Sequence, residues 1–537
     1  MALETSKPLE VLTRFRFAVV AFALLIIVVL GWRGREPLGI TSGDDLTYLA
    51  LSKSLESGSY RETFLAGAPL HVKYPPGYPL WLLAVRKVGG ANLDVIRGTN
   101  LALLAVFALC LYGIVRRVAG VPLALAAVLL VALNHTLLRS GGTLLSEPLF
   151  LALVGASLLC TVRAGPADGR YAAAAIGFAV AAYLTRSAGL ALLLALGLWL
   201  WQRRRPRELI AYAAISLLAV GGWFAYTTSV PPALSGWSYG LDVARGLRTS
   251  IPGVGARFLQ SFWSKSVGYV TEGLPWSVGL PSVRGTILDN LAWLATMVVL
   301  LLAGLLVCWR KARAVVGYMI FGWILLTLWP WRVERLLEPL VPFVIAGMLI
   351  GMQSVTGRAP EAWRVPAILA LVVLMGFGAA RSSLARDVVM SKCDRNDPYR
   401  SPGCYQPEAR VLVEAAEYLR LHAPPGSIVV TVDPPGMNYL SGLRTERPQL
   451  LAGLPEGTAV RTLRERKIEY VVLYGRGEFE RRRLAPALLR SCRELRVEAR
   501  FGARGLLLFT DSPRTAAEDA CAALDALAVV PPSGDIR

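Results

Sequence analysis

The stretch FRFAVVAFALLIIVVLGW, residues 15–32, decides the fold class. Apart from Arg16 it holds only apolar residues and glycine. A helix needs about 20 such residues to cross a hydrocarbon core of about 30 Å. The residues around its end, Gly31-Trp32-Arg33-Gly34-Arg35, do not form the small-residue site at which a signal peptide is cleaved. We therefore expect this segment to remain in the protein as a membrane anchor.

Apolar segments of this kind recur along the chain up to residue 381. We count about eleven, and they cover residues 15–32, 95–115, 119–138, 144–162, 171–185, 187–201, 208–227, 286–308, 314–330, 335–353 and 364–381. The composition agrees, because 54% of the residues are apolar and the mean hydropathy is +0.49. So little polar surface is unsuited to a soluble enzyme. The sequence predicts an α-helical polytopic membrane protein.

The charge of the chain follows the expected loops. Lys and Arg number 57 against 37 Asp and Glu, which gives a net charge of +20. Basic residues cluster in alternate loops, as the positive-inside rule requires, and the expected inner clusters are Lys7, Arg14, Arg16, Arg116, Arg117, Arg163, Arg170, Arg203, Arg204, Arg205, Arg207, Arg310, Lys311, Arg313, Arg358 and Arg364. This pattern places the N-terminus in the cytoplasm. Because the basic residues lie at the ends of apolar segments, membrane lipids rather than nucleic acid are the expected partners.

Three segments on the expected outer face are too long to be simple connectors: residues 33–94, residues 228–285 and the tail 382–537. Long loops on one face mark where a polytopic protein works. We therefore divide the chain into a transmembrane domain, 1–381, and an extracytoplasmic domain, 382–537. The tail has soluble composition and alternates amphipathic helices with apolar strands, which predicts a small α/β domain; these elements are Glu408–Leu421, Ser427–Val432, Glu469–Tyr474 and Glu478–Leu489.

The cysteines fit this placement. Cys110, Cys160 and Cys308 fall inside expected spans, and the tail holds the other four, Cys393, Cys404, Cys492 and Cys521. An even number outside the cytoplasm permits disulfides, and Cys393 with Cys404 would close a short loop. Four unrelated thiols are the alternative. The absence of any Cys-x-x-Cys pair argues against structural zinc.

Two motifs in the first outer segment carry the candidate chemistry. Asp44 and Asp45 follow Gly43 and begin a helix-like stretch at the expected membrane boundary, where a carboxylate avoids the cost of the hydrocarbon. The alternative interpretation is a helix N-cap. About thirty residues later comes HVKYPPGYPLW, residues 71–81, a rigid turn that is also typical of an aromatic interfacial anchor. The spacing suits a loop that lies along the membrane and returns.

These motifs resemble those of the C-type-fold glycosyltransferases that use polyprenyl-phosphate sugars, in particular the branch of the protein O-mannosyltransferases and the lipid A aminoarabinose transferase. That family carries an acidic pair after its first span, followed three residues later by Tyr, and a Pro-Pro motif that closes the first outer loop. The matching positions here are Asp44-Asp45 with Tyr48, Tyr74-Pro75-Pro76-Gly77, and, more weakly, Ser146-Glu147-Pro148, Thr185-Arg186-Ser187 and the stretch from Arg332 to Pro342. This chain departs from the family at Asp45, where Glu is frequent, and at Tyr74, where several relatives have Lys.

The resemblance implies an inverting transfer of a sugar from a polyprenyl-phosphate donor to an acceptor hydroxyl. Asp44, with Asp45 second, would accept the proton of the hydroxyl. The donor phosphate would be held by Arg186, Arg332, Arg335, Lys73 and Tyr74. Acceptor or substrate would be positioned by Tyr48, Glu147, His71 and Tyr78.

Each role has a structural alternative. Each arginine could be an interfacial anchor or the partner of an acid such as Glu334 or Glu338, and Glu147 could owe its place to helix capping by Ser146. No cofactor is certain. A divalent metal is one alternative, with His71 and His135 joining Asp45 or Glu147 as ligands.

The expected setting is the bacterial cytoplasmic membrane, with a glycan, lipid or protein acceptor in cell-envelope glycosylation. The lipid chain of the donor would lie in a groove between spans, with the aromatic-rich segment 228–285 covering the site. A transporter or flippase of lipid-linked sugars is the main rival, although it should place charges near the bilayer midplane and show internal repeats. A non-catalytic assembly protein is a third interpretation.

Overall fold

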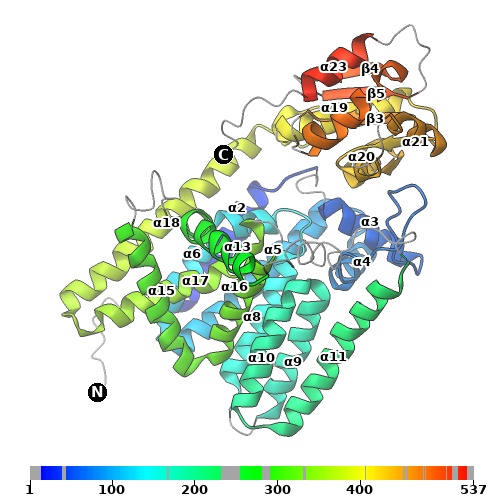
Figure 1. The fold of residues 1–537 in the computed structure, drawn as a ribbon. Helices are drawn as coiled ribbons and strands as arrows, with labels where there is room; N and C mark the ends of the chain where they lie inside the picture. The colour runs from blue at the N-terminus through cyan, green and yellow to red at the C-terminus, as the bar shows by residue number, and fades with distance from the viewer. Residues whose placement is uncertain are drawn as a thin grey trace. The chain divides into compact units, whose positions relative to one another are not determined.

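The computed structural model describes residues 14–38, 44–165, 168–231, 254–280, 291–329, 334–405, 407–451, 454, 457–475, 477, 479–502, 505–510 and 518–528. The chain forms two compact units (Figure 1). The helical unit comprises Met1–Arg35 and Val72–Ser391, and the sheet unit comprises Glu36–His71 and Lys392–Arg537. The segment Glu36–His71, which we expected to belong with the membrane domain, thus groups with the tail. The functional division at residue 381 stays a prediction.

Helices of the helical unit follow the expected apolar segments. They are α2 (Arg16–Arg33), α4 (Gly77–Gly89), α5 (Leu93–Ala119), α6 (Val121–Ala132), α7 (His135–Gly141), α8 (Glu147–Arg163), α9 (Gly169–Thr185), η1 (Ser187–Gly189), α10 (Leu190–Gln202), α11 (Pro206–Ser229), α13 (Val254–Gly268), η2 (Tyr269–Gly273), α14 (Leu274–Ser277), α15 (Leu291–Lys311), α16 (Arg313–Leu328), η4 (Glu334–Leu337), α17 (Val341–Val355), η5 (Thr356–Arg358) and α18 (Glu361–Ser391).

The expected count of about eleven spans is not confirmed. Among the described residues, five helices are long and apolar enough to cross a membrane, namely α2, α5, α11, α15 and α18. A sixth is possible if α6 and α7 form one span, and two further apolar helices are shorter. The break between α6 and α7 bends the chain by 61°. It has a local cause, because the side chain of Asn134 accepts a hydrogen bond from the backbone N–H of Leu137 and so starts a new helix.

Glycines let α15 and α17 approach closely. A Cβ atom on Gly304 would lie 1.9 Å from the carbonyl oxygen of Gly347, and one on Gly351 would lie 1.8 Å from that of Leu300. Neither position therefore accepts a larger residue without moving the helices apart. Small residues four apart are the usual means of close packing between membrane helices, where the lipid supplies no hydrophobic drive to associate.

A five-stranded sheet forms the centre of the sheet unit, in the order β2-β1-β3-β5-β4. Strands β1, β2 and β3 run parallel, and β5 pairs antiparallel with β3 and β4. The elements of the unit are α3 (Asp44–Glu56), η6 (Pro402–Cys404), α19 (Pro407–His422), β1 (Ile428–Val430), α20 (Pro434–Ser441), β2 (Arg444–Glu446), η7 (Pro448–Leu450), α21 (Ala459–Glu465), β3 (Tyr470–Leu473), η8 (Glu480–Leu484), α22 (Ala485–Leu489), η9 (Cys492–Glu494), β4 (Arg496–Phe501), β5 (Gly505–Phe509) and α23 (Glu518–Ala528).

Both faces of this sheet are buried. Val471 and Leu473 of β3 contribute to a core with α21, α22 and α23, whereas Tyr470 and Val472 contribute to a second core with α19 and α20. This alternation is the period of two that a strand requires. The expected strands and helices of the tail are therefore present, and the domain is α/β as predicted. The structure adds β2, β4 and β5.

Two disulfides close loops of the sheet unit. Cys393 is bonded to Cys404, as the short spacing favoured, and Cys492 is bonded to Cys521. The remaining cysteines, Cys110, Cys160 and Cys308, are free thiols.

Candidate active site

The two units share the predicted site residues between them. Asp44, Asp45, Tyr48 and His71 belong to the sheet unit. The helical unit holds Lys73, Tyr74, Tyr78, Glu147, Arg186 and Arg335. Arg332 lies outside the described residues.

The acidic pair occupies the first turn of α3. Helix α3 begins at Asp44, so the two carboxylates lie within the helix, where they suit the positive end of its dipole. Asp45 is fully buried and Tyr48, three residues later on the same side of the helix, is 2% exposed. Asp44 is only partly buried. Of the two acids, Asp44 is therefore the more accessible to a substrate.

A third carboxylate, Asp433, belongs to the same region of the sheet unit. It follows β1 and caps α20 by accepting a hydrogen bond from the backbone N–H of Gly436 at 3.1 Å. Helix α20 packs against α3. Burial raises the pKa of Asp433 to about 6, and the charges of Asp45 and Asp44 act in the same direction. The tail thus adds an acid to the predicted pair.

Sequence reasoning missed Asp433, although a signal was present. The tetrapeptide Asp433-Pro434-Pro435-Gly436 directly follows a predicted buried strand. An Asp before proline at that place is typical of a helix start at the carboxyl end of a strand. Its proximity to Asp44 could not be predicted, since nearly 390 residues separate the two in sequence.

The loop between the acidic motif and His71 is joined to the edge of the sheet. The backbone N–H of Thr445 on β2 donates to the carbonyl of Phe64 at 3.0 Å, and the N–H of Ala66 donates to the carbonyl of Thr445 at 2.9 Å. The loop thus covers one edge of the sheet and satisfies its backbone groups. Because α3 lies in the same segment, the tail holds the acidic motif in place.

His71 takes part in this attachment. Its Nδ1 lies 2.8 Å from Oε1 of Glu62, and Arg447 forms an ion pair with the other carboxylate oxygen. Glu62 and His71 are each 1% exposed. Burial alone would raise the pKa of Glu62, but His71 and Arg447 together outweigh it and hold that pKa below its usual value. The contact of His71 with Glu62 is therefore structural.

In the helical unit, Glu147 brings two of the predicted arginines together. Its Oε1 lies 2.8 Å from Nη1 of Arg186 and accepts a hydrogen bond from Nε of Arg335. Glu147 is fully buried at the start of α8. Glu334 and Glu338 were the expected partners of the arginines, and Glu147 is a further one. Glu338, 5% exposed, belongs to the same cluster, where its charge interacts with that of Glu147.

The capping interpretation of Ser146 is wrong. Its side chain makes no cap hydrogen bond to α8, and its hydroxyl accepts instead from Nη1 of Arg186 at 2.9 Å. Arg186 lies in the extended turn between α9 and η1. The Ser-Glu-Pro and Thr-Arg-Ser motifs, whose adjacency the sequence did not reveal, are therefore in direct contact.

The Pro-Pro-Gly motif packs against the same turn. A Cβ atom on Gly77 would lie 2.6 Å from the backbone carbonyl oxygen of Leu184 and 2.9 Å from the nitrogen of Thr185. Only glycine permits this approach, which fixes the start of α4 beside the residue that precedes Arg186. Tyr78 is fully buried, and its hydroxyl accepts from Nδ2 of Asn100 at 3.2 Å. These contacts give Tyr78 a structural role, and its predicted role in positioning the substrate stays a prediction.

Lys73 lies one position before Tyr74, where several members of the resembled family have Lys. Its Nζ lies 4.6 Å from the centre of the Tyr74 ring, within the range of a cation–π contact. Tyr74 is 5% exposed. The role of both residues in phosphate binding stays a prediction.

The described residues do not form a preorganised site for the divalent metal considered above. No group of three or more His, Cys, Asp or Glu side chains is arranged to hold a metal ion there. His135 packs edge-on against Trp276, with ring centres 4.2 Å apart.

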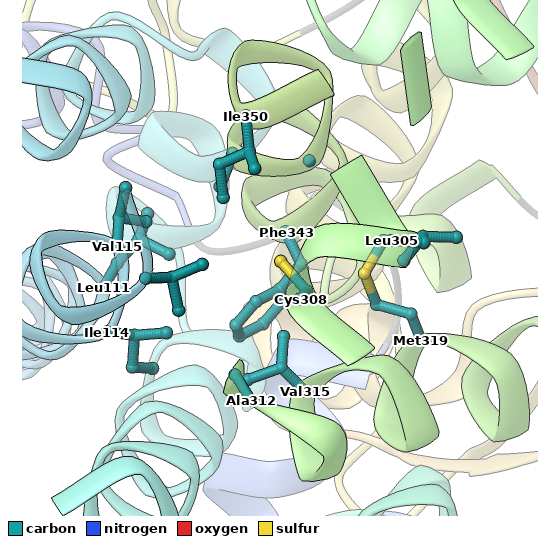
Figure 2. Close-up of a pocket in the computed structure, with 13 residues that line it drawn as sticks. Leu111, Ile114, Val115, Leu305, Cys308, Ala312, Val315, Met319, Phe343 and Ile350 are labelled. Atoms are coloured by element: carbon teal, nitrogen blue, oxygen red, sulfur yellow. The ribbon is translucent and has the colours of Figure 1, made fainter. Parts of the chain in front are cut away.

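An apolar cavity lies between α5, α15, α16 and α17 (Figure 2). Leu111, Cys308, Val315, Phe343 and Ile350 are among the side chains that line it. Its volume is about 20 Å³, which is roughly that of a single water molecule. This cavity is therefore too small to be the predicted groove for a polyprenyl chain.

Comparison of the sequence with protein-family models and with curated proteins finds no match. Solved structures do match. The oligosaccharyltransferase AglB from Archaeoglobus fulgidus, in a complex with Zn and sulfate, has a TM-score of 0.55 at 12% identity and covers 90% of this chain and 72% of its own. ArnT from Cupriavidus metallidurans, in the apo state, has a TM-score of 0.53 at 14% identity and covers 93% of this chain and 99% of its own.

These likenesses confirm the C-type glycosyltransferase fold that the motifs predicted. With its apolar helices, the chain is a multi-pass membrane protein of this fold. The two neighbours are glycosyltransferases, and they lend no support to the flippase alternative. At such low identity the likeness establishes the fold alone, so the reaction has to be argued from the residues.

Proposed function

We propose that the chain is an inverting glycosyltransferase that moves a sugar from a polyprenyl-phosphate donor to an acceptor hydroxyl. The observation that carries this proposal is the pair Asp44 and Asp45 in the first turn of α3, in a chain with the C-type fold. A buried acid, Asp45, and a more accessible one, Asp44, stand side by side, with Asp433 near them. Such clustering of acids is one way to obtain a carboxylate that accepts a proton near neutral pH.

In the proposed reaction the acceptor oxygen attacks the anomeric carbon of the sugar. A bond forms between that oxygen and the anomeric carbon, and the bond from the carbon to the phosphate oxygen breaks. The hydroxyl proton passes to the carboxylate of Asp44, and the electron pair of the broken bond leaves with the lipid phosphate. Attack from the side opposite the phosphate inverts the configuration. Asp45, which is fully buried, supports Asp44 from the next position.

The leaving phosphate is already anionic, so it needs positive charge more than a proton. We assign this role to Arg186 and Arg335, with Arg332 and Lys73 as further candidates. The recorded bonds to Glu147 use Nη1 of Arg186 and Nε of Arg335. A guanidinium carries its N–H donors in a planar fork that matches the oxygens of a phosphate. Glu147 would hold both groups in fixed orientations, which favours binding of a phosphate without reorganisation.

The class of donor is proposed from the neighbours. AglB has been solved in complex with an inhibitory peptide and a dolichol-phosphate. A polyprenyl-phosphate sugar is accordingly our proposed donor, and a glycan, lipid or protein hydroxyl our proposed acceptor. We place the reaction at the outer face of a bacterial cytoplasmic membrane, with the N-terminus in the cytoplasm and the sheet unit outside. The basic clusters of the alternate loops support this orientation.

The direct test measures transfer from radiolabelled polyprenyl-phosphate sugars to candidate acceptors in membranes that contain the protein. Asp44→Asn is compared with wild type and with Glu56→Gln, an exposed acid on the same helix. We expect Asp44→Asn to abolish most transfer and Glu56→Gln to retain it. Full turnover by both Asp44→Asn and Asp45→Asn would overturn the assignment of the base. Lack of transfer by the wild type with every donor in the set would count against the proposed activity.

A further inference from the structure

A second pocket lies in the helical unit, where α8, α10 and α15 end and α16 begins. Its volume is about 220 Å³. Four cationic side chains line it, together with Gln202 and Trp199; the cations are Arg203, Arg310, Lys311 and Arg313. No acidic residue belongs to the lining. We call this site the basic pocket.

Two of the four cations are held by helix ends. Arg203 donates to the carbonyl oxygens of Ala164 and Gly165 and lies 4.8 Å from the centre of the Trp199 ring. Lys311 donates to the carbonyl of Val118 at 2.7 Å. These contacts stabilise the unpaired carbonyls at the ends of helices. Arg203 and Lys311 thus have a structural role in the wall of the pocket.

The other two cations have no such explanation. Arg310 lies in the last turn of α15 and Arg313 is the first residue of α16, and both side chains are exposed. Within the described part of the chain, neither has a recorded ion pair or side-chain hydrogen bond. The buried Oε1 of Gln202 also lacks a hydrogen-bond partner among the described residues. A buried polar atom without a partner in the wall of a pocket indicates a missing ligand or water, and the exposed cations beside it favour an anion.

Two large apolar side chains that lie close in sequence to lining residues are exposed. Trp201, directly before Gln202, is 66% exposed, and Leu306 on α15 is 69% exposed. Side chains of this size are favourable there only if they face hydrocarbon or another apolar partner. The N-terminus of α16 also lies at the pocket, and its partial positive charge favours an anion. A phosphate with attached acyl chains would satisfy both the basic and the apolar surfaces.

We propose that the basic pocket binds the phosphodiester headgroup of an anionic phospholipid. Arg310 and Arg313 would hold the phosphate, Oε1 of Gln202 would accept a hydrogen bond from a hydroxyl of the headgroup, and the acyl chains would lie along Trp201 and Leu306. Basic pockets between membrane helices on the cytoplasmic side bind such headgroups in other proteins. In the orientation proposed above, the lipid belongs to the inner leaflet. The site is separate from the residues assigned to transfer.

The alternative is that these arginines only set the topology of the chain. That role needs positive charge anywhere in the loop, whereas a binding site needs these particular side chains. Arg358, before α18, and Arg364, at the start of α18, supply a matched control, because they are another pair of arginines expected on the inner side and do not line the pocket. The two double variants, Arg310→Gln/Arg313→Gln and Arg358→Gln/Arg364→Gln, remove the same charge.

The test measures binding of phosphatidylglycerol to the purified full-length protein in neutral detergent, by native mass spectrometry, with phosphatidylcholine as the zwitterionic reference. Wild type should prefer phosphatidylglycerol. The pocket variant should lose this preference by about tenfold or more, and the control variant should keep it within about twofold. Equal loss in both variants, or no preference in the wild type, would overturn the proposal. Inorganic phosphate at the same concentration should leave the lipid bound, and displacement by phosphate would assign the pocket to a soluble ligand instead.

Discussion

Two buried or partly buried acids of this protein have opposite surroundings. Glu147, in the helical unit, is fully buried and contacts Arg186 and Arg335. Asp433, in the sheet unit, has Asp44 and Asp45 as the charges that act upon it. Burial disfavours a charged carboxylate in both places. Cations relieve that cost at Glu147, and neighbouring acids add to it at Asp433.

The difference separates two uses of an acid. A carboxylate between two guanidinium groups holds them in place, and its removal leaves buried charge without a partner. A carboxylate among carboxylates has a raised affinity for protons, which is a property that a proton acceptor needs. On this comparison, we propose that Glu147 orients the arginines and that the acid cluster around α3 supplies the carboxylate that accepts the proton.

The largest expected effect is the loss of sugar transfer when an acid of the cluster around α3 is removed. Asp44→Asn should lower transfer by about 100-fold or more, since a positioned general base contributes about 10²- to 10⁴-fold. Asp45→Glu, which restores the acid frequent in the resembled family, should retain most activity. The measurement is the rate of sugar transfer under saturating donor. A drop of less than about threefold in Asp44→Asn would remove Asp44 from the reaction.

Loss of Glu147 should act on stability. Glu147→Gln leaves Arg186 and Arg335 without their carboxylate, and breaking a buried pair from one side costs about 3 to 5 kcal/mol. The melting temperature of the purified protein should fall clearly. If the cost comes from the unpaired arginines, adding Arg335→Gln to Glu147→Gln should recover part of it. An unchanged melting temperature in the single variant would show that Glu147 does not orient the arginines.

Loss of the Glu62 carboxylate, which helps to join the first outer loop to the sheet, should have the next largest effect on stability. Glu62→Gln should weaken the contacts to His71 and Arg447 and lower the free energy of unfolding by about 2 kcal/mol at pH 7. Because the folded state lowers the pKa of Glu62, its ionised form contributes stability above the unfolded value, and this contribution is lost as the pH falls through the folded value. Wild type and variant should therefore converge on acidification. Thermal melts from pH 7 down to about pH 3 measure this, and a gap that stays equal over the whole range would contradict it.

Removal of the Asp433 carboxylate should have a smaller effect on stability, with the opposite sign. Its pKa is raised from 3.8 to about 6, so the folded state favours the protonated form. Stability from this group is fully present below pH 3.8 and falls as the pH rises to about 6. Asp433→Asn should remove that fall and match or exceed wild-type stability at pH 7, by about 1 kcal/mol. A variant that is less stable than wild type at pH 7 would show that the carboxylate's cap on α20 outweighs its repulsion.

The lesson for sequence reasoning differs between the two units. The helices of the membrane domain and the α/β character of the tail could be predicted, because apolar periodicity depends only on near neighbours in sequence. The pairing of Glu147 with Arg186 and Arg335 could not, because it joins residues up to 188 positions apart. The capping interpretation of Ser146 failed for the same reason, since its hydroxyl accepts a hydrogen bond from Arg186, which is distant in sequence. Span count was the weakest prediction, as several apolar helices are shorter than their apolar segments suggest.

The grouping of 36–71 with the tail shows a further limit. The segment follows the first apolar span in sequence, yet Phe64, Leu65 and Ala66 contact Thr445 on the edge of the sheet. Edge pairing depends on backbone groups, which every residue carries, so no side-chain pattern reveals it. Asp433 escaped notice for a related reason, because its acidic neighbours come from that same segment.

The central claim is that Asp44 accepts the acceptor's proton, and single-turnover transfer tests it most directly. Purified wild type and Asp44→Asn are each loaded with a labelled polyprenyl-phosphate sugar, and donor binding and the first turnover are measured separately. The account predicts that Asp44→Asn binds the donor as tightly as wild type and transfers the sugar about 100-fold or more slowly. Equal first-turnover rates, or a defect confined to donor binding, would contradict it.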